Sequence, residues 1–219
     1  SGAAWHCRHL WEHYAFNGDK EYLRTKGYPI MKEAAEFWLE NMVEYQGHFI
    51  IAPSVSAEHG IEMKNGSPVE YSTTNGEQTE GRLFTVPAYQ DIEMVYDLYS
   101  HVIKAAECLN TDSVFRQKLL IAKNKLLPLK IGRYGQLQEW IDDVDNPHDH
   151  HRHLAHLYAL YPGNRISYTR TPALAQAVRK SLEMRGKGKF GDRWPHTGGN
   201  WSMAWRTALW ARLYDGNQA

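Results

Sequence analysis

A cluster of polar and aromatic side chains between residues 134 and 156 offers the most chemistry in the sequence. Its members are the carboxylates Glu139, Asp142, Asp143 and Asp145, the indole of Trp140, and an arginine with three histidines in the segment 151–156. Aromatic rings stack on the apolar faces of sugars, while carboxylates and planar donors bind sugar hydroxyls. The cluster therefore predicts a carbohydrate site, although a solvated acidic loop beside structural histidines accounts for the same residues.

The longest predicted loop runs from about residue 52 to 88, with a polar second half over 64–81, and supplies a candidate acid, Glu58. A connection of this length in a compact domain is usually functional or disordered. Pro53, Ser54 and Ser56 precede Glu58 and can hold its backbone in a turn. A carboxyl fixed on such a turn near aromatic side chains can donate a proton to a leaving group. On composition alone, a solvated loop glutamate is the stronger interpretation.

Histidines are dense enough between residues 148 and 156 to suggest a zinc or iron site. His153 and His156 are three positions apart, a spacing that would place both on one face of a helix. However, the sequence contains no His-Glu-x-x-His motif and no cysteine pair at metal-ligand spacing. We therefore predict no metal and no cofactor, and we assign hydrogen bonding as the role of these histidines.

Charge and hydropathy narrow the class of protein. The 219 residues carry 25 basic and 25 acidic side chains, so electrostatics favour neither nucleic acid nor an anionic membrane as a partner. The sequence has no run of 18 apolar residues, which excludes an ordinary membrane-spanning helix. The two cysteines, Cys7 and Cys108, do not make a disulfide framework.

Most of the chain has helical periodicity. Three sets of apolar positions each predict a helix: Ile30, Ala34, Phe37 and Asn41, with Met31, Ala35, Trp38 and Met42 beside them; Ile92, Val95, Tyr99, Val102, Ala106 and Leu109; and Leu174, Val178 and Leu182. Pro29 and Pro172 stand in first helical turns, where a missing N–H costs little. A further helix is predicted over 200–214, and only residues 47–52 resemble a strand, in a minor hairpin or an extended loop.

Three helix ends share one pattern, in which an aromatic residue or leucine is followed by turn residues and then by Asp or Asn. They are residues 16–19, 109–112 and 214–217, and the acidic or amide side chain can cap the next helix. Repeated helical hairpins bury their apolar faces by stacking on neighbours. We therefore predict an all-α toroid of helical hairpins. About seven helices are fewer than a closed ring of six hairpins needs, which favours a fragment of a longer chain.

Longer motifs span nearly the whole chain. They are GAAWHCRHLWEHY at 2–14, NGD at 17–19, YPIMK at 28–32, AAEF at 34–37, PSVSAE at 53–58, YGQLQEW at 134–140, HRH at 151–153, HLY at 156–158, YPGN at 161–164 and GNWSMAW at 199–205. In this order they resemble the catalytic domain of glycoside hydrolase family 95, the inverting 1,2-α-L-fucosidases.

The resemblance implies an (α/α)6 barrel. Residues 1–219 would be the central part of a single catalytic domain, with flanking parts missing at both ends. The implied activity is hydrolysis of terminal α-L-fucosyl linkages, 1,2-linked above all, with inversion by a general-acid glutamate and an activated water. The implied partners are a fucosylated glycan substrate and the remainder of the catalytic domain, and the parent protein would be secreted or periplasmic.

The resemblance also implies roles for individual residues. Glu58 matches the position of the family's general acid. Trp11 and Tyr14 match its sugar-contacting aromatic residues, which spacing alone would assign to the core. Arg152 and His153 match its polar contacts to the fucose hydroxyls.

Two departures from the family pattern bear on activity. The family usually has Ser-Pro-Glu-Asn around its acid, whereas residues 56–59 are Ser-Ala-Glu-His. Its water-activating asparagine pair, and the aspartate that polarises this pair, have no match in the 219 residues, and an inverting hydrolase needs both halves. We therefore expect the isolated chain to be inactive. The alternatives are an α-L-galactosidase of the same family, a non-catalytic carbohydrate-binding fragment, and an (α/α)6 sugar epimerase or isomerase.

Overall fold

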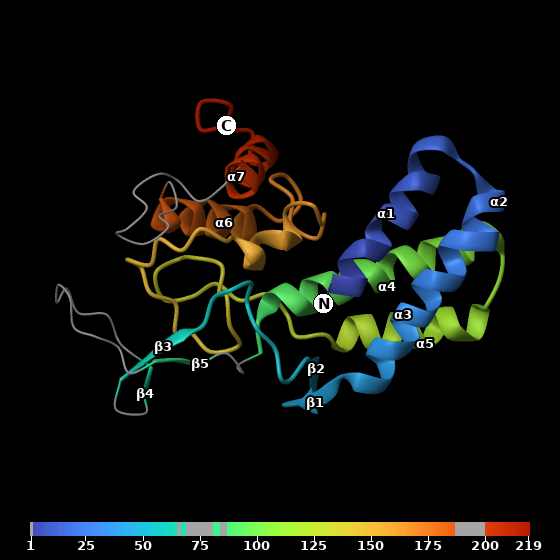
Figure 1. Cartoon of the computed structure of the whole chain (residues 1–219), viewed down its shortest axis with the longest axis horizontal. Helices are drawn as coiled ribbons and strands as arrows, with labels where there is room; N and C mark the ends of the chain where they lie inside the picture. Colours follow the sequence, from blue (N-terminus) through green and yellow to red (C-terminus); the bar gives the residue numbers. More distant parts are fainter. Residues whose placement is uncertain (1, 65–66, 69–80, 84–86, 187–199) are drawn as a thin grey trace. The chain divides into compact units, whose positions relative to one another are not determined.

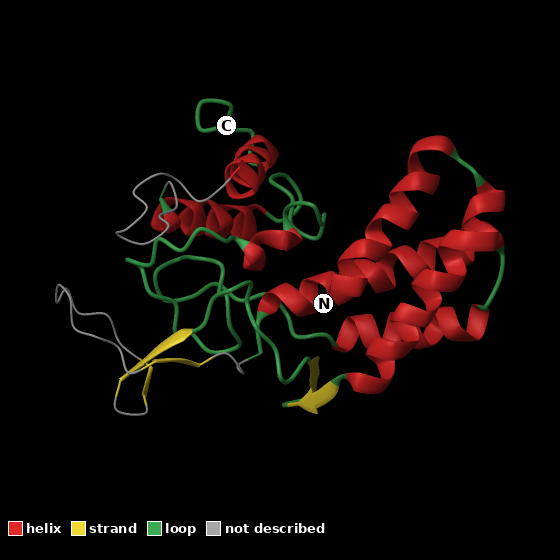
Figure 2. Cartoon of the chain, in the orientation of Figure 1, coloured by secondary structure: helices red, strands yellow, loops and turns green. Residues whose placement is uncertain are grey.

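The computed structural model describes residues 2–64, 67–68, 81–83, 87–186 and 200–219. These residues are mostly helical, which confirms the all-α prediction (Figure 2). The chain divides into two compact units, each built from two segments of the sequence. Residues 1–52 and 91–128 form the first unit, and residues 53–90 and 129–219 form the second.

The first unit is a group of helices with one small hairpin (Figure 1). Its elements are α1 (Gly2–Asn17), α2 (Lys20–Tyr22), a π-helical turn (Leu23–Gly27), α3 (Tyr28–Asn41), β1 (Val43–Tyr45), β2 (His48–Ile50), most of α4 (Tyr89–Leu109) and α5 (Ser113–Lys125). Strands β1 and β2 pair antiparallel. Between them Gln46 and Gly47 have φ values of 51° and 80°, as a type I′ turn requires. The predicted hairpin is confirmed, although it begins before residue 47.

Helix α4 supplies much of the core of the first unit. Its predicted apolar stripe is buried, and Val95, Tyr99 and Val102 have no exposed surface. On α3, by contrast, the predicted stripe that contains Ile30 and Phe37 is not buried, because these two side chains are 50% and 54% exposed. The neighbouring stripe, with Met31, Ala35 and Trp38, is the buried one. Both stripes have helical spacing, and the packing of α3 against α1 decides between them.

Two of the predicted capping residues begin helices in the first unit. Asp19 is the N-cap of α2, and its carboxylate accepts a hydrogen bond from the Tyr22 N–H at 2.9 Å. Asp112 is the N-cap of α5 but makes no capping hydrogen bond. Its carboxylate instead accepts hydrogen bonds from Tyr28 and Lys32 of α3, both at 2.8 Å. Asp112 therefore joins two helices rather than capping one.

The second unit combines a small sheet with helices. Its elements are β3 (Ile61–Lys64), β4 (Ser67–Pro68), β5 (Gly81–Leu83), a 3-10 turn (Ala155–Ala159), α6 (Pro172–Arg185) and α7 (Asn200–Arg212). The strand order is β4-β3-β5, with both pairs antiparallel. The segment predicted to be a long loop thus contains strands, which corrects that prediction. Strands of two to four residues are too short for their period-two pattern to be visible.

Helix α6 begins where the sequence predicted, with Thr171 at its N-cap and a proline in its first turn. Its predicted stripe enters the core of the second unit, where Val178 and Leu182 are buried together with Leu157 and Tyr158. Across the described parts of the two units, no helix is both long and apolar enough to cross a membrane.

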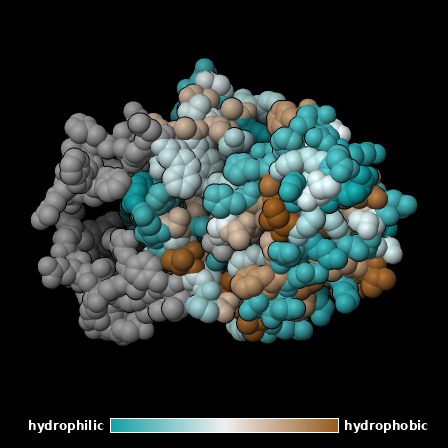
Figure 3. Space-filling model, turned by 45° about the vertical axis from the view of Figure 1, so that its right-hand side comes forward, coloured by the Kyte–Doolittle hydropathy of each residue, from teal (hydrophilic) through white to brown (hydrophobic). Residues whose placement is uncertain are grey.

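Large hydrophobic side chains are also exposed in both units. Figure 3 shows such residues in brown, in separate patches on one face of the molecule. In the first unit Phe16 is 90% exposed and Val114 is 72% exposed. In the second unit Trp201 is 59% exposed.

Candidate active site

A tight turn at residues 56–59 carries Glu58. The backbone N–H of His59 donates a hydrogen bond to the Ser56 carbonyl at 2.9 Å. Glu58 has a φ of 49°, in the left-handed region that a glutamate rarely adopts. Residues in such a conformation persist only where their surroundings hold them, and they concentrate at functional sites.

The carboxylate of Glu58 contacts Arg152 and His153. The Arg152 guanidinium forms an ion pair with Glu58 Oε2, and His153 Nε2 lies 3.1 Å from the same oxygen. The Glu58 side chain is 65% exposed, whereas the side chains of Arg152 and His153 are 20% and 11% exposed. Three of the five predicted site residues are therefore neighbours, although 95 positions separate Glu58 from His153. They present to solvent a carboxylate beside two side chains that can bind hydroxyls.

An exposed indole that the sequence analysis did not assign to the site lies beside this trio. The ring centroids of Trp201 and His153 are 5.8 Å apart. Trp201 also stacks on Trp205, with 6.0 Å between centroids and 7° between planes. Trp205 is buried and donates from Nε1 to the Tyr161 carbonyl at 2.8 Å. The available signal was the spacing of the two tryptophans, since residues four apart share a helix face.

Trp11 and Tyr14, the other two predicted residues, lie in α1 of the first unit. Their ring centroids are 5.5 Å apart, and both side chains are partly exposed. Trp11 also stacks on His101, with 5.3 Å between centroids and 12° between planes. Burial lowers the pKa of His101 to about 4, so a neutral imidazole supports the indole near pH 7. The aromatic pair is well supported, and its contact with sugar stays a prediction.

Buried charges contact the Glu58 turn from within the second unit. The carboxylate of Glu139 accepts hydrogen bonds from Ser56 Oγ and from the Arg185 guanidinium. Burial acts to raise the pKa of Glu139, but the charge of Arg185, the neighbouring histidines and the hydrogen bond from Ser56 together outweigh it, and the pKa is lowered to about 2. Glu139 and Trp140 are 1% and 4% exposed. These two members of the cluster are therefore not open to a sugar, whereas Arg152 and His153 of the same cluster contact Glu58, and a carbohydrate site there stays a prediction.

Asp149 is the second carboxylate of this network. It accepts a hydrogen bond from Arg185 at 2.9 Å, and its Oδ2 lies 2.7 Å from His59 Nε2. Burial opposes ionisation here as well, yet the Arg185 charge and the His59 hydrogen bond hold the pKa of Asp149 well below its usual range. One guanidinium is thus flanked by two carboxylates, Glu139 and Asp149, and a buried charge needs such partners.

A third carboxyl, Asp145, is buried next to Glu139. It accepts hydrogen bonds from Gln136 Nε2 and from the Glu139 backbone N–H, both at 3.2 Å. Burial and the negative charge of Glu139 raise the pKa of Asp145 to about 7. Asp145 is therefore partly protonated at neutral pH, in contrast to its neighbour.

Histidines of the 148–156 segment surround the turn. His151 Nε2 lies 3.2 Å from the Ala57 carbonyl, and the His151 ring stacks on that of His59. Burial lowers the pKa of both His151 and His156 to about 4. The contact of His151 with the Ala57 carbonyl agrees with the hydrogen-bonding role assigned from the sequence, while His156 Nδ1 is buried without a hydrogen-bond partner in the described part of the chain. Among the described residues, no group of three or more His, Cys, Asp or Glu side chains is placed to hold a metal ion.

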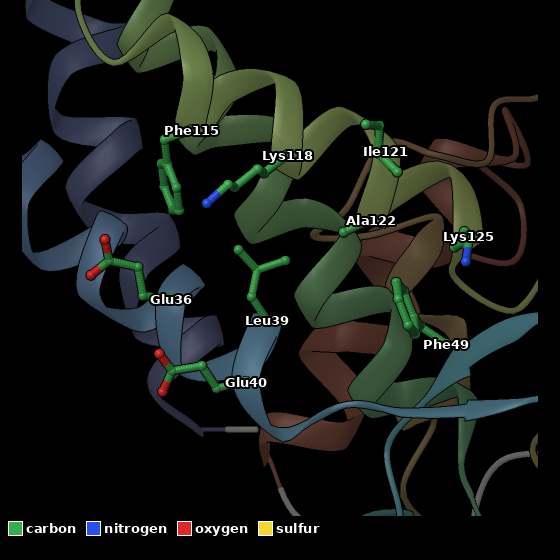
Figure 4. A pocket seen from close by; sticks show the side chains of 9 residues that line it. All are labelled: Glu36, Leu39, Glu40, Phe49, Phe115, Lys118, Ile121, Ala122 and Lys125. Carbon is green, nitrogen blue, oxygen red and sulfur yellow. The ribbon is translucent and has the colours of Figure 1, made fainter.

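A separate groove of about 520 Å³ lies in the first unit, between α3 and α5 (Figure 4). Its apolar lining comes from Leu39, Phe49, Phe115, Ile121 and Ala122. Two glutamates of α3 and two lysines of α5 stand at its sides. The groove offers apolar surface with charge, but none of the five predicted site residues lines it.

Comparison with known proteins gives a consistent result. The Glycosyl hydrolase family 95 catalytic domain matches residues 1–219. The chain is 35% identical to "Alpha-L-fucosidase 2" of Arabidopsis thaliana over 100% of its own length and 24% of that protein. It is 33% identical to "Probable alpha-fucosidase A" of Aspergillus niger, over 96% of the chain and 25% of that protein. A protein of the same name from Aspergillus oryzae is 28% identical over 82% of the chain. The chain spans about a quarter of the length of the first two relatives.

Proposed function

The chain belongs to the glycosyl hydrolase family 95 catalytic domain family, and from this membership we propose that the whole protein hydrolyses terminal α-L-fucosyl linkages of glycans. The 1,2-linkage and inversion at the anomeric carbon are part of the proposal. The observation that supports it best is the exposed carboxyl of Glu58, held in a left-handed turn beside Arg152 and His153.

In the proposed reaction, Glu58 is the general acid. Its proton passes to the glycosidic oxygen as the bond from that oxygen to the anomeric carbon breaks. A water molecule attacks the anomeric carbon from the opposite face and gives up a proton to a base, so that the configuration inverts. We expect the base in a part of the catalytic domain beyond these 219 residues, because the chain lacks the family's water-activating motifs.

The pairing of Glu58 with Arg152 imposes a requirement on this mechanism. A neighbouring guanidinium favours the ionised form of a carboxyl, whereas a general acid must be protonated when the bond breaks. Sugar hydroxyls can accept hydrogen bonds from Arg152 and His153 and so replace Glu58 as their partner. We infer that substrate binding releases the Glu58 carboxyl to take up and transfer its proton.

Aromatic side chains complete the proposed site. Trp11 and Tyr14 are assigned to the walls of the fucose pocket, as the family motif indicates. Trp201, which the structure adds, stands next to His153 with most of its ring exposed. An indole fixed by stacking on Trp205 can pack against the apolar face of a sugar with little loss of conformational entropy.

The test of the proposed acid is Glu58→Gln in the whole protein. Glutamine keeps the shape of the side chain but has no acidic proton. We expect turnover of natural fucosides to fall by a factor of about 10²–10⁴, the usual contribution of acid catalysis. Aryl fucosides with acidic leaving groups should lose far less, since their departure needs little protonation. The measurement is kcat and KM for both substrate classes.

The matched control is Glu183→Gln, which neutralises an exposed glutamate of α6 in the same unit and should leave both rates unchanged. Equal losses on both substrate classes for Glu58→Gln would show that Glu58 is not the acid. Faster hydrolysis of the matching α-L-galactoside would favour α-L-galactosidase activity, which differs by one sugar hydroxyl. Sugar binding without turnover in the whole protein would indicate a non-catalytic domain.

A further inference from the structure

The side chains at both ends of the Glu58 turn are bound to the buried ions. At the first position, Ser56 Oγ donates to Glu139, and Ser56 is 1% exposed. At the last position, His59 pairs with Asp149 at 2.7 Å and is 2% exposed. Arg185 bonds to both carboxylates and so connects the two ends of the turn through one guanidinium.

The backbone of the turn is fixed as well. The N–H of Ala57 donates to Gln90 Oε1 at 2.8 Å, and Gln90 is 8% exposed. The carbonyl of Ala57 lies 3.2 Å from His151 Nε2 and can only accept a hydrogen bond from it. Ser56, Ala57 and His59 are therefore each bound to a buried or partly buried partner, while the Glu58 carboxylate binds the partly exposed side chains of Arg152 and His153. Glu58 itself holds the unfavourable φ and faces solvent.

We propose that Ser56 and the buried Glu139–Arg185–Asp149 network are positioning residues, which hold the turn so that the Glu58 carboxyl is aimed at the glycosidic oxygen. This inference rests on the proposed role of Glu58 as the general acid. Glu139, Arg185 and Ser56 cannot act on the substrate directly, because they are 1%, 6% and 1% exposed. The side chain of Asp149 is 19% exposed, and its Oδ2 is bound to Arg185 and His59.

Three physical arguments favour positioning over a purely structural role. Buried ion pairs often add little net stability, because the cost of desolvating the charges is comparable to their attraction. A left-handed glutamate is strained and persists only where its surroundings over-determine its conformation. Proton transfer requires the acid to lie within hydrogen-bond reach of the leaving oxygen, and a displacement of about 1 Å can cost roughly 10²-fold in rate. A rigid ionic support under the turn meets that requirement.

The direct test is Ser56→Ala in the whole protein, which removes only the hydroxyl between the turn and Glu139. We expect kcat on natural fucosides to fall about 10- to 100-fold, with KM nearly unchanged. Aryl fucosides with good leaving groups should lose much less, as for Glu58→Gln. The matched control is Ser181→Ala, which removes another buried hydroxyl of the second unit, one that bonds to Leu137. This control should lower the melting temperature to a similar extent without distinguishing the two substrate classes.

A double-mutant cycle separates the two hypotheses. If Ser56 acts through Glu58, Ser56→Ala should have little further effect on natural fucosides in a Glu58→Gln background. An equal loss in both backgrounds, or equal losses on the two substrate classes, would overturn the positioning role while leaving the acid in place. If Glu58→Gln alone shows no dependence on the leaving group, the proposed function itself fails.

Discussion

At the scale of single residues, two glutamates of the second unit differ in their surroundings, since the Glu58 side chain is 65% exposed and Glu139 is 1% exposed. Glu58, Arg152 and His153 are adjacent in the structure, and it was the family motifs, rather than their composition, that singled them out. The sequence predicted Glu139 to be part of a carbohydrate site, because it is a carboxylate beside an indole. Its position in a buried ion network depends instead on Arg185, 46 positions away. A partner so distant in the sequence leaves no local pattern, so the burial of Glu139 could not be predicted.

Asp145 provides a prediction at this scale, because its pKa is raised to about 7 by burial and by the charge of Glu139. A carboxyl whose folded-state pKa lies above its unfolded value, about 4, contributes stability that is complete below pH 4. That contribution is lost as the pH rises through 7. Asp145→Asn has no proton to lose there. Between about pH 4 and 8 the variant should therefore gain stability relative to the unaltered protein, on the order of 2–4 kcal/mol.

The measurement is the free energy of unfolding in urea. Tryptophan fluorescence monitors the unfolding of both proteins across this pH range. Asp142→Asn is a suitable control, because Asp142 is an exposed aspartate of the same segment, three positions from Asp145. Parallel stability curves for Asp145→Asn and the unaltered protein would contradict the raised pKa.

At the scale of elements, helical periodicity and capping residues predicted most helices and where some of them begin. Proline and Thr171 fixed the start of α6, and Asp19 caps α2 as its position suggested. Periodicity could not choose between two adjacent stripes on α3, because the choice depends on how α1 packs there. The sequence pattern also placed Asp112 at a helix start without revealing that its carboxylate bonds to α3.

Asp112→Asn tests this link between α3 and α5. The hydrogen bonds from Lys32 and Tyr28 lower the pKa of Asp112, so its contribution to stability is present above about pH 4. The contribution is lost as the pH falls through the lowered pKa. Near neutral pH the variant should lose about 1 kcal/mol, a modest value because the pair is about one-third exposed. This difference should shrink as the solution is acidified.

The control is Asp19→Asn, because asparagine and aspartate are about equally good N-caps. Thermal or urea unfolding of both variants at neutral and acidic pH gives the comparison. A loss for Asp112→Asn that is independent of pH would mean that the charge of Asp112 does not carry the link.

At the scale of the whole molecule, the site residues belong to two compact units. Trp11 and Tyr14 are in the first, and Glu58, Arg152 and His153 are in the second. The family motifs predicted this set as one pocket of a single catalytic domain, and that arrangement stays a prediction. The helical character could be predicted because periodicity is local. The packing of the units depends on contacts between distant residues, and in a complete catalytic domain also on the parts that surround them. This chain spans about a quarter of the length of its first two relatives, so its sequence does not specify those contacts.

The last prediction concerns the 219-residue chain expressed by itself. Phe16, Val114 and Trp201 are 90%, 72% and 59% exposed, and large apolar side chains at a surface promote association. We therefore expect the isolated chain to self-associate, with an apparent mass that rises with concentration in light scattering.

The isolated chain should also lack fucosidase turnover, because an acid without a water-activating group cannot complete an inverting displacement. The whole protein, as the control, should be less prone to association and should turn over fucosides. A monodisperse, monomeric chain that hydrolyses fucosides would show that the water-activating group lies within these residues, and the search for it would then begin among the carboxylates of the second unit.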